Sequence, residues 1–251
     1  MGDKVVLTEN LDSVSEILPR SCEFIRPPVA NVNQMIVVLS LVSPAVDLRL
    51  VDTMLFYIET KEIEPVICIN KCDLDAGDSY TMVQKIYEKA GYRVIVTSAK
   101  EGEGKDELTE ILKDKITAFA GNSGVGKSSL LNLIENEFEL ETGEVSHKVE
   151  RGKHTTRHVE LLSLPFGGFV LDTPGFGKID LPKMEKEKIK YYMREMRDYN
   201  DACMFRGCNH ISEKGCAVIK AVNEGKIAAS RHESYLAFFE ELKNYKDWTD
   251  K

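Results

Sequence analysis

Gly121-Asn122-Ser123-Gly124-Val125-Gly126-Lys127-Ser128 matches the phosphate-binding loop G-x-x-x-x-G-K-[ST] at every fixed position. The match follows an apolar run at residues 116–120 and opens a helical pattern, which is the strand–loop–helix context that this loop requires. Its glycines allow backbone N–H groups to close around phosphates at a helix N-terminus, where anions are favoured. We therefore expect residues 121–129, Ser129 included, to bind a nucleotide. Lys127 should act as a catalytic residue by reaching the β- and γ-phosphates, and Ser128 should ligate Mg²⁺.

Four further nucleotide-binding motifs surround this loop in an unusual order. Asn70-Lys71-Cys72-Asp73 and Ser98-Ala99-Lys100 precede the loop, while Thr155-Thr156 and Asp172-Thr173-Pro174-Gly175 follow it. Ordinary GTP-binding domains place the phosphate loop first and the N-K-x-D motif near the end. The observed order predicts a circularly permuted domain, in which the base-recognition half precedes the phosphate half.

The N-K-x-D motif predicts recognition of guanine. It directly follows the strand-like run at residues 65–69, and ligands bind at the carboxyl ends of strands in such sheets. The Asp73 carboxylate can accept hydrogen bonds from guanine N1–H and N2–H₂, a pair that adenine does not offer. Taken alone, Ser98-Ala99-Lys100 would fit a turn at the end of a strand equally well. The expected base-binding residues are Asn70, Lys71 (with its stem stacked on the base), Cys72, Asp73, Ser98, Ala99 and Lys100.

The two motifs after the phosphate loop predict a magnesium ion beside the γ-phosphate. Asp172 suits a water-mediated contact with Mg²⁺, and the Gly175 amide suits the γ-phosphate. Thr155-Thr156 lies between the two phosphate motifs, so one of these threonines is the expected Mg²⁺ ligand, and we favour Thr156. The predicted magnesium ligands are therefore Ser128, Thr156 and Asp172.

The catalytic group that positions water is not the usual one. Phe176 follows Gly175, at the position where many GTPases carry a glutamine that orients the attacking water. Because a phenyl ring cannot do this, either hydrolysis is slow or another group substitutes. His154, one residue before the threonine pair, is our candidate catalytic residue; the alternative is an exposed histidine of the basic segment at residues 147–158.

A cysteine cluster near the C-terminus predicts a zinc site. Cys203-x₄-Cys208-x-His210-x₅-Cys216 offers three thiolates and one imidazole, which is a complete tetrahedral Zn²⁺ ligand set. With no open position the site should be structural, holding together a unit too small for a core of its own. Buried structural cysteines or a redox pair are the alternatives, although the Cys-x-x-Cys spacing of redox motifs is absent from this cluster.

The composition is that of a globular protein. The chain has 251 residues, of which 43% are hydrophobic and 29% charged. Its longest apolar run, residues 35–42, is too short to span a bilayer, and no signal-peptide pattern is present. The cysteines do not form a disulfide framework, so we expect a reducing compartment, the cytoplasm, and no membrane partner. A net charge of −8 argues against a general nucleic-acid coat protein.

Periodicity predicts an α/β core followed by helices. Apolar strand-like runs alternate with helical stretches across residues 35–120, as in a parallel sheet covered by helices. Residues 159–164 and 168–171 read as a strand pair joined by a short turn. After Gly175 the pattern is helical, and the apolar stripe within residues 234–245 is expected to be core packing.

The motif order, with the zinc cluster after it, resembles the circularly permuted bacterial GTPases that act on the small ribosomal subunit. The resemblance runs from about residue 2 to 244. It implies GTP hydrolysis stimulated by the small subunit, a role in its late maturation, and a monomer that contacts GTP or GDP, the subunit and its rRNA. The family's histidine before the paired threonines falls on His154, and its zinc ligands fall on Cys203, Cys208, His210 and Cys216. Further matching stretches are residues 26–32, 142–146, 151–156, 215–218 and 230–236.

The same resemblance implies three domains. Members carry an N-terminal OB-fold, a small β-barrel type suited to RNA, but only about 28 residues precede the GTPase core in this chain. Residues 2–6 and 15–19 look like the last strands of such a barrel, and whether the rest is truncated or absent is left open. We expect a partial OB-fold at residues 1–28, a circularly permuted P-loop GTPase domain at 29–182, and a mainly helical zinc-binding domain at 183–251.

Two other functions fit parts of the sequence. The chain could be a GTP-sensing adaptor with negligible hydrolysis and a non-ribosomal partner, which Phe176, the acidic net charge and the incomplete barrel would favour. A zinc-dependent hydrolase would need an open metal position, which four protein ligands deny. Stimulation of GTP hydrolysis by small subunits would separate the small-subunit GTPase from the adaptor.

Overall fold

The computed structural model describes residues 1–24, 29–77, 79–135, 160–172 and 180–245. Its central feature is a six-stranded sheet of order β7-β6-β5-β8-β10-β9, in which all neighbours are parallel except β10 and β9. The strands are β5 (Gln34–Leu39), β6 (Glu64–Ile69), β7 (Arg93–Val96), β8 (Ile116–Ala120), β9 (Glu160–Ser163) and β10 (Phe169–Asp172). The helices beside them are α1 (Leu48–Thr60), α2 (Ser79–Lys89), α3 (Lys105–Leu112) and α4 (Lys127–Ile134).

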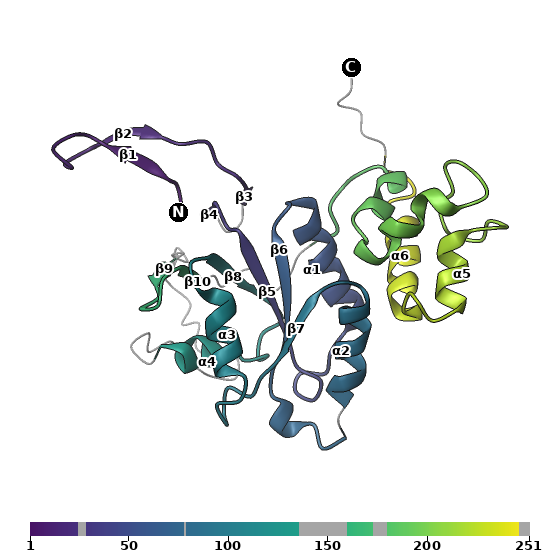
Figure 1. The fold of residues 1–251 in the computed structure, drawn as a ribbon, viewed down its shortest axis with the longest axis horizontal. Coiled ribbons are helices and arrows are strands. Elements are labelled where there is room, and N and C mark those ends of the chain that lie inside the picture. The colour runs from purple at the N-terminus through teal and green to yellow at the C-terminus, as the bar shows by residue number, and fades with distance from the viewer. Residues whose placement is uncertain (25–28, 78, 136–159, 173–179, 246–251) are drawn as a thin grey trace, which may run out of the picture.

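Helices cover both faces of this sheet (Figure 1). In β5, Met35, Val37 and Leu39 face the core shared with α1 and α2, whereas Ile36 and Val38 face the core shared with α3 and α4. A strand buried on both faces needs apolar residues at every position, which explains the continuous apolar run in the sequence.

The connections between strands place the switch point of the sheet between β5 and β8. From β5 the chain moves outward to β6 and β7, then crosses to β8 on the other side of β5, where β10 and the edge strand β9 extend the sheet. Ligands bind at the carboxyl ends of strands at such a point. The phosphate loop begins at the end of β8 and the N-K-x-D motif at the end of β6, so the predicted halves meet at one edge of the sheet.

The predicted strand at residues 35–42 is shorter than expected. β5 ends at Leu39, in register with Ile69 at the end of β6. Because both strands end in step, residues 40–46 leave the sheet as a loop and lead to α1. Asp47 caps α1 by accepting the backbone N–H of Arg49 and Leu50.

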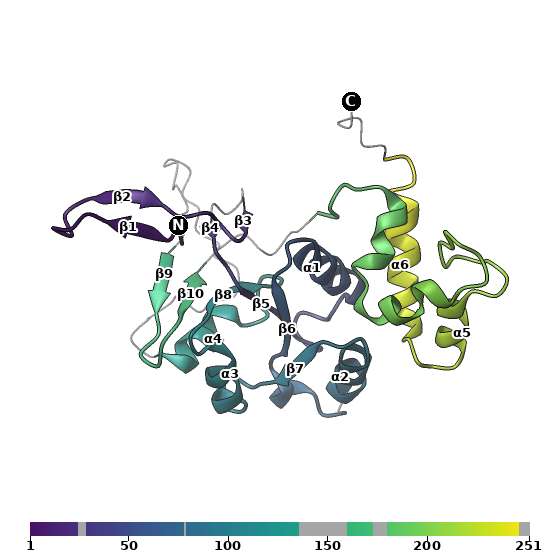
Figure 2. The same cartoon turned by 45° about the horizontal axis from the view of Figure 1, so that its top comes forward.

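The N-terminal residues form a projecting hairpin. β1 (Val5–Leu7) and β2 (Val14–Ile17) pair antiparallel, so the two segments assigned to barrel strands are indeed neighbours. The hairpin extends away from the sheet (Figures 1 and 2). All residues of both strands are exposed. Two short strands, β3 (Glu23–Phe24) and β4 (Val29–Ala30), lead from it into β5.

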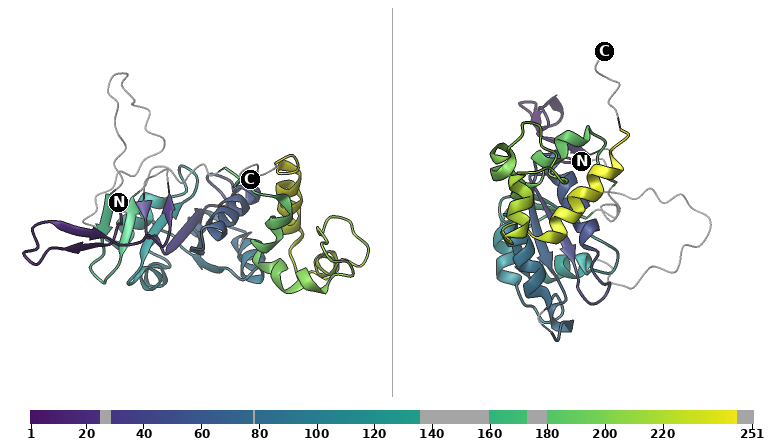
Figure 3. Two further views of the ribbon diagram at one scale, coloured as in Figure 1. Left: turned by 90° about the horizontal axis from the view of Figure 1, so that it is seen from above. Right: turned by 90° about the vertical axis from the view of Figure 1, so that its right-hand side faces the viewer.

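The C-terminal part is a helical unit packed on α1, at the opposite end of the molecule from the hairpin (Figure 3). It consists of η3 (Lys186–Tyr191), η4 (Arg194–Ala202), α5 (Ala217–Asn223) and α6 (Ala229–Glu241). Its core contains Phe238, Phe239 and Leu242, and Phe56 of α1 inserts into it, so the apolar stripe is core packing as predicted. Within the described ranges, no helix combines the length and apolar character needed to cross a membrane.

Candidate nucleotide and metal sites

The three motifs of the described residues that predict nucleotide binding line one cleft. It has a volume of about 560 Å³, within the range of small-molecule sites. Asn132 and Leu133 of α4 also line the cleft and were not predicted. Their spacing of three and four residues from Ser129 puts all three side chains on one helix face, a signal that could have identified them. The lining residues are Asn70, Lys71, Asp73, Leu74, Ala99, Lys100, Gly126, Ser129, Asn132 and Leu133.

Asn70 connects the three motifs. Its side-chain Nδ2 donates to the Val125 carbonyl of the phosphate loop at 2.9 Å. Its Oδ1 accepts the Ala99 N–H and the Thr97 hydroxyl, each at 3.1 Å. Asn70 is only 1% exposed, and the bonds to Val125 and Thr97 are buried, so this side chain sets the phosphate loop relative to both predicted base-binding loops.

Asp73 and Lys71 are each oriented by a further hydrogen bond. The Ser98 hydroxyl donates to Asp73 Oδ1 at 2.6 Å, which fixes the carboxylate that is expected to read guanine. Lys71 adopts a left-handed backbone conformation, and its ammonium donates to the Ser43 carbonyl at 2.7 Å. The lysine stem therefore lines the cleft between the two loops, as stacking on a base requires.

Neighbouring atoms approach two positions of the phosphate loop so closely that only glycine fits. At Gly121, with φ +139°, a Cβ would lie 2.2 Å from the Val38 carbonyl oxygen. At Gly126, with φ +97°, a Cβ would lie 2.3 Å from Asn70 Nδ2. The Lys127 ammonium donates to the Gly121 and Asn122 carbonyls at 2.8 Å each, so it lies over the loop where phosphates are expected.

Cys72 is a neutral thiol within the base-binding loop. Its Sγ donates to Glu103 Oε2 at 3.1 Å. Burial, together with the hydrogen bond to Glu103 and its negative charge, raises the pKa of Cys72 to about 11. The thiol is therefore protonated at neutral pH and can only donate to the glutamate.

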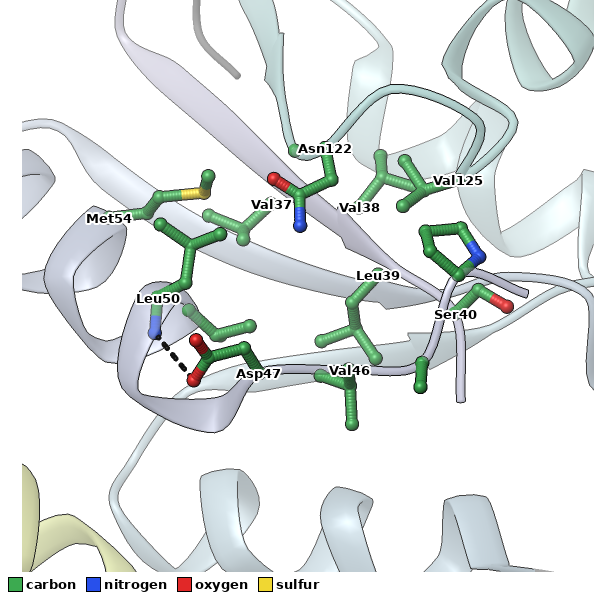
Figure 4. A pocket seen from close by; sticks show the side chains of 14 residues that line it. Val37, Val38, Leu39, Ser40, Val46, Asp47, Leu50, Met54, Asn122 and Val125 are labelled. Carbon is green, nitrogen blue, oxygen red and sulfur yellow. Dashed lines mark hydrogen bonds between the residues drawn. The ribbon is translucent and has the colours of Figure 1, made fainter. Parts of the chain in front are cut away.

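A second, small pocket lies on the other side of the phosphate loop, between β5, the 40–46 loop and α1 (Figure 4). Leu39, Leu50 and Met54 make it largely apolar, and the Asn122 side chain points into it. The Asp47 carboxylate lies at its rim, where it accepts the Leu50 N–H. Side chains of β5, α1 and the phosphate loop surround this pocket, which offers little polar surface for a ligand.

Several predicted phosphate and magnesium residues lie outside the described residues, namely His154, Thr155, Thr156 and Gly175. Asp172 ends β10, the parallel neighbour of β8, whose end begins the phosphate loop. The roles of these five residues stay predictions from the sequence.

The cysteine cluster forms a compact group of ligand atoms. Cys203, Cys208, His210 and Cys216 place one ligand atom each within 4.8 Å of one another. Cys203 Sγ lies 3.9 Å from Cys216 Sγ, and His210 Nδ1 lies 3.5 and 3.3 Å from these two sulfurs. A tetrahedral zinc ion with ordinary bond lengths requires roughly 3.8 Å between sulfurs and about 3.6 Å between sulfur and nitrogen. The four residues therefore fit zinc.

The groups around the cluster favour metal binding. His210 Nε2 donates to Asn200 Oδ1 at 2.9 Å, which leaves Nδ1 as the lone-pair nitrogen facing the sulfurs. Burial and the nearby Lys190 ammonium lower the pKa of His210 to about 4, so the imidazole is neutral, as a ligand must be. Backbone N–H groups at the start of α5 point at two sulfurs: Ala217 to Cys203 at 3.3 Å and Ile219 to Cys216 at 3.4 Å.

Comparison with known proteins gives matches along almost the whole chain. A family model described as RsgA GTPase matches residues 17–182. The small ribosomal subunit biogenesis GTPase RsgA of Caldanaerobacter subterraneus subsp. tengcongensis is 48% identical over 240 residues, covering 95% of this chain and 80% of the relative. That of Geobacillus thermodenitrificans is 46% identical over 252 residues, covering 98% and 86%.

Two solved structures share the fold. YjeQ from Thermotoga maritima superposes with a TM-score of 0.82 at 38% identity, covering 98% of this chain and 84% of YjeQ. YloQ, described as a circularly permuted GTPase, superposes with a TM-score of 0.80 at 38% identity, covering 96% and 80%. The circularly permuted GTPase fold predicted from the motif order is thus confirmed.

Proposed function

The chain belongs to the RsgA family of GTPases, and from this premise we propose that it hydrolyses GTP to GDP and phosphate during assembly of the small ribosomal subunit. The observation that carries the proposal is the cleft in which Asn70 joins the guanine-reading loops to the phosphate loop. Two relatives named for small ribosomal subunit biogenesis support the ribosomal part. We further propose that the small subunit stimulates hydrolysis, and that the step belongs to late maturation.

In this proposal each motif has one task. Asp73, held by Ser98, accepts the guanine N–H groups, and leaving this carboxylate unpaired rejects adenine. Residues 121–129 bind the phosphates through backbone N–H groups, and Lys127 offsets the negative charge of the β- and γ-phosphates. Ser128, Thr156 and Asp172 would hold Mg²⁺, which supplies further charge neutralisation when bound.

His154 is proposed to orient or activate the attacking water in place of the usual glutamine. His154→Ala should lower the turnover of GTP by about tenfold or more and leave GTP affinity unchanged, because general acid–base groups typically contribute 10²–10⁴-fold. His147→Ala, in the same basic segment, is the matched control and should retain turnover. Unchanged turnover in His154→Ala would remove this residue from the mechanism.

The metal site is proposed to be structural zinc. Cys203, Cys208, His210 and Cys216 fill all four positions, so no position remains for a catalytic water.

The division into residues 1–28, 29–182 and 183–251 stays a prediction, as do rRNA binding, a monomeric state and action in the cytoplasm.

The deciding experiment measures GTP turnover with and without purified small ribosomal subunits, with ATP as the control nucleotide. Strong stimulation that is specific to GTP supports the proposed function. Slow turnover that does not respond to subunits favours the adaptor, whose partner would be non-ribosomal. Fusing a complete OB-fold to the N-terminus then separates these two functions: stimulation by subunits that appears on fusion supports the GTPase, and turnover that stays unresponsive supports the adaptor.

A further inference from the structure

A buried ionic cluster joins the metal-binding part of the chain to the GTPase sheet. Arg231 of α6 donates to Asp52 of α1 at 2.7 Å and, through two nitrogens, to Glu195 of η4 at 2.7 and 3.1 Å. The three side chains are only 1%, 1% and 3% exposed. Removing one partner of such a group leaves an uncompensated buried charge. The loss of any one of the three side chains would therefore destabilise the contact between α1, η4 and α6.

Asp52 is the member that belongs to the GTPase sheet. Besides Arg231, its carboxylate accepts the hydroxyl of Tyr87 in α2 at 2.9 Å and that of Ser234 in α6. The Tyr87 ring lies 5.8 Å from the Arg231 guanidinium. Asp52 therefore accepts hydrogen bonds both from the GTPase sheet side, through Tyr87, and from the C-terminal unit, through Arg231 and Ser234.

The two elements that supply Arg231 and Glu195 also hold the metal ligands. In α6, His232 Nε2 donates to the His210 carbonyl at 2.8 Å and the Tyr235 hydroxyl donates to the Asn209 carbonyl at 2.6 Å. In η4, Asn200 accepts from the His210 ring at 2.9 Å. Each element thus contacts the metal ligand His210 and, one or a few residues away, a member of the ionic cluster.

We propose that metal binding and docking of the C-terminal unit on α1 are linked equilibria, with Asp52, Arg231 and Glu195 as positioning residues. A bound metal ion fixes residues 203–216, and with them the carbonyls that α6 requires. A fixed α6 then presents Arg231 to Asp52. Such coupling is reciprocal, so loss of the Asp52 charge weakens metal binding, and loss of the metal loosens α1. The inference rests on the proposed metal site and is independent of GTP hydrolysis.

The first test is the affinity for Zn²⁺ of the full chain, measured by competition with a chromophoric chelator. Asp52→Asn keeps the shape but removes the charge that faces Arg231, and it should weaken Zn²⁺ binding by about 5-fold to 150-fold, the usual range of coupling between sites. Arg49→Met is the matched control, because Arg49 pairs with Glu241 across the same contact but both side chains are half exposed, at 56% and 53%. Its Zn²⁺ affinity should stay within about twofold of the parent's, since exposed ion pairs contribute little.

The second test needs no variant. Hydrogen exchange of the parent chain is compared before and after Zn²⁺ is removed by a chelator. Removal should raise exchange in residues 51–59 of α1, which contain no metal ligand, and leave α3 unchanged, because α3 packs on the opposite face of the sheet. This measurement stands even if Asp52→Asn fails to fold.

Either of two results overturns the inference while the proposed metal site stands. One is an Asp52→Asn variant that folds and binds Zn²⁺ as tightly as the parent. The other is exchange in α1 that does not respond to Zn²⁺. A parent chain that binds no Zn²⁺ also overturns it, together with the proposed metal site, while the proposed GTPase activity would still stand or fall by its own turnover assay.

Discussion

Asn70→Ala should destabilise the protein and separate the base-binding loops from the phosphate loop. The substitution removes the partner of the Val125 carbonyl and of the Ala99 N–H, while the Thr97 hydroxyl keeps a contact with Cys68 Sγ at 3.3 Å. Leaving a buried group unpaired costs about 1–3 kcal/mol. The bond to Val125 is buried but the bond from Ala99 is only part-buried, so we expect a loss of about 1–3 kcal/mol in the free energy of unfolding. For a chain of this size that corresponds to a fall in melting temperature of about 2–12 °C.

The assay combines thermal unfolding, followed by circular dichroism, with titration of a fluorescent GDP analogue. Affinity for GDP should fall by at least about tenfold, because the two loops no longer share a rigid connection. Asn33→Ala is the matched control: Asn33 accepts the Ile116 N–H at 2.9 Å, at the end of the sheet away from the cleft, and is exposed. If Asn70→Ala melts and binds GDP like Asn33→Ala, the connecting role assigned to Asn70 is wrong.

Three further outcomes are expected. Gly126→Ala should weaken GDP binding by at least about tenfold, because its methyl group would lie 2.3 Å from the Asn70 amide, and the same titration measures it. Alkylation of Cys72 by iodoacetamide should rise about tenfold per pH unit up to its pKa of about 11, since the thiolate is the nucleophile; Glu103→Gln should lower that pKa and speed the reaction at pH 8, as followed by mass spectrometry. Cys216→Ser should reduce bound zinc, measured by elemental analysis of the purified chain, from about one per chain to near zero, because zinc prefers a full set of four ligands.

Matched variants separate these effects from general damage. Gly91→Ala introduces the same left-handed backbone strain, at φ +86° with open space around the new Cβ, and should leave GDP affinity unchanged. Cys22→Ser lies outside the metal cluster and should retain zinc. Loss of GDP binding in Gly91→Ala would contradict the steric role of Gly126, and loss of zinc in Cys22→Ser would contradict the ligand role of Cys216.

Motifs whose residues lie close together in the chain could be recognised from the sequence. The phosphate loop and the cysteine cluster each have a spacing set by their ligand, so they could be read without a structure. The connecting role of Asn70 could not, because its acceptor Val125 follows 55 residues later and meets it only through the order of the strands. The motif marks Asn70 as a nucleotide-binding residue, whereas its side-chain bonds within the protein hold the loops together.

Burial of charge was the other feature that the sequence could not show. The apolar stripe within residues 234–245 marks only part of α6, which starts at Ala229, because residues 230–233 are polar. Arg231 in that polar turn is buried because Asp52 and Glu195, distant in the chain, neutralise it. The roles of His154, Thr155, Thr156, Asp172 and Gly175 remain predictions.

The strand order has a consequence for how the protein folds on the ribosome that makes it. β5 has two neighbours, and β6 is synthesised soon after it, whereas β8 emerges only after α3. Until then the nascent chain holds half a sheet whose apolar strand β5 has one unpaired edge, the kind of edge that invites pairing with other chains. The loops predicted to bind guanine exist at that stage, but the predicted phosphate loop does not. Nucleotide binding can therefore stabilise the domain only after residues 121–128 have also emerged, and the strands before them must pass through synthesis without help from a bound nucleotide.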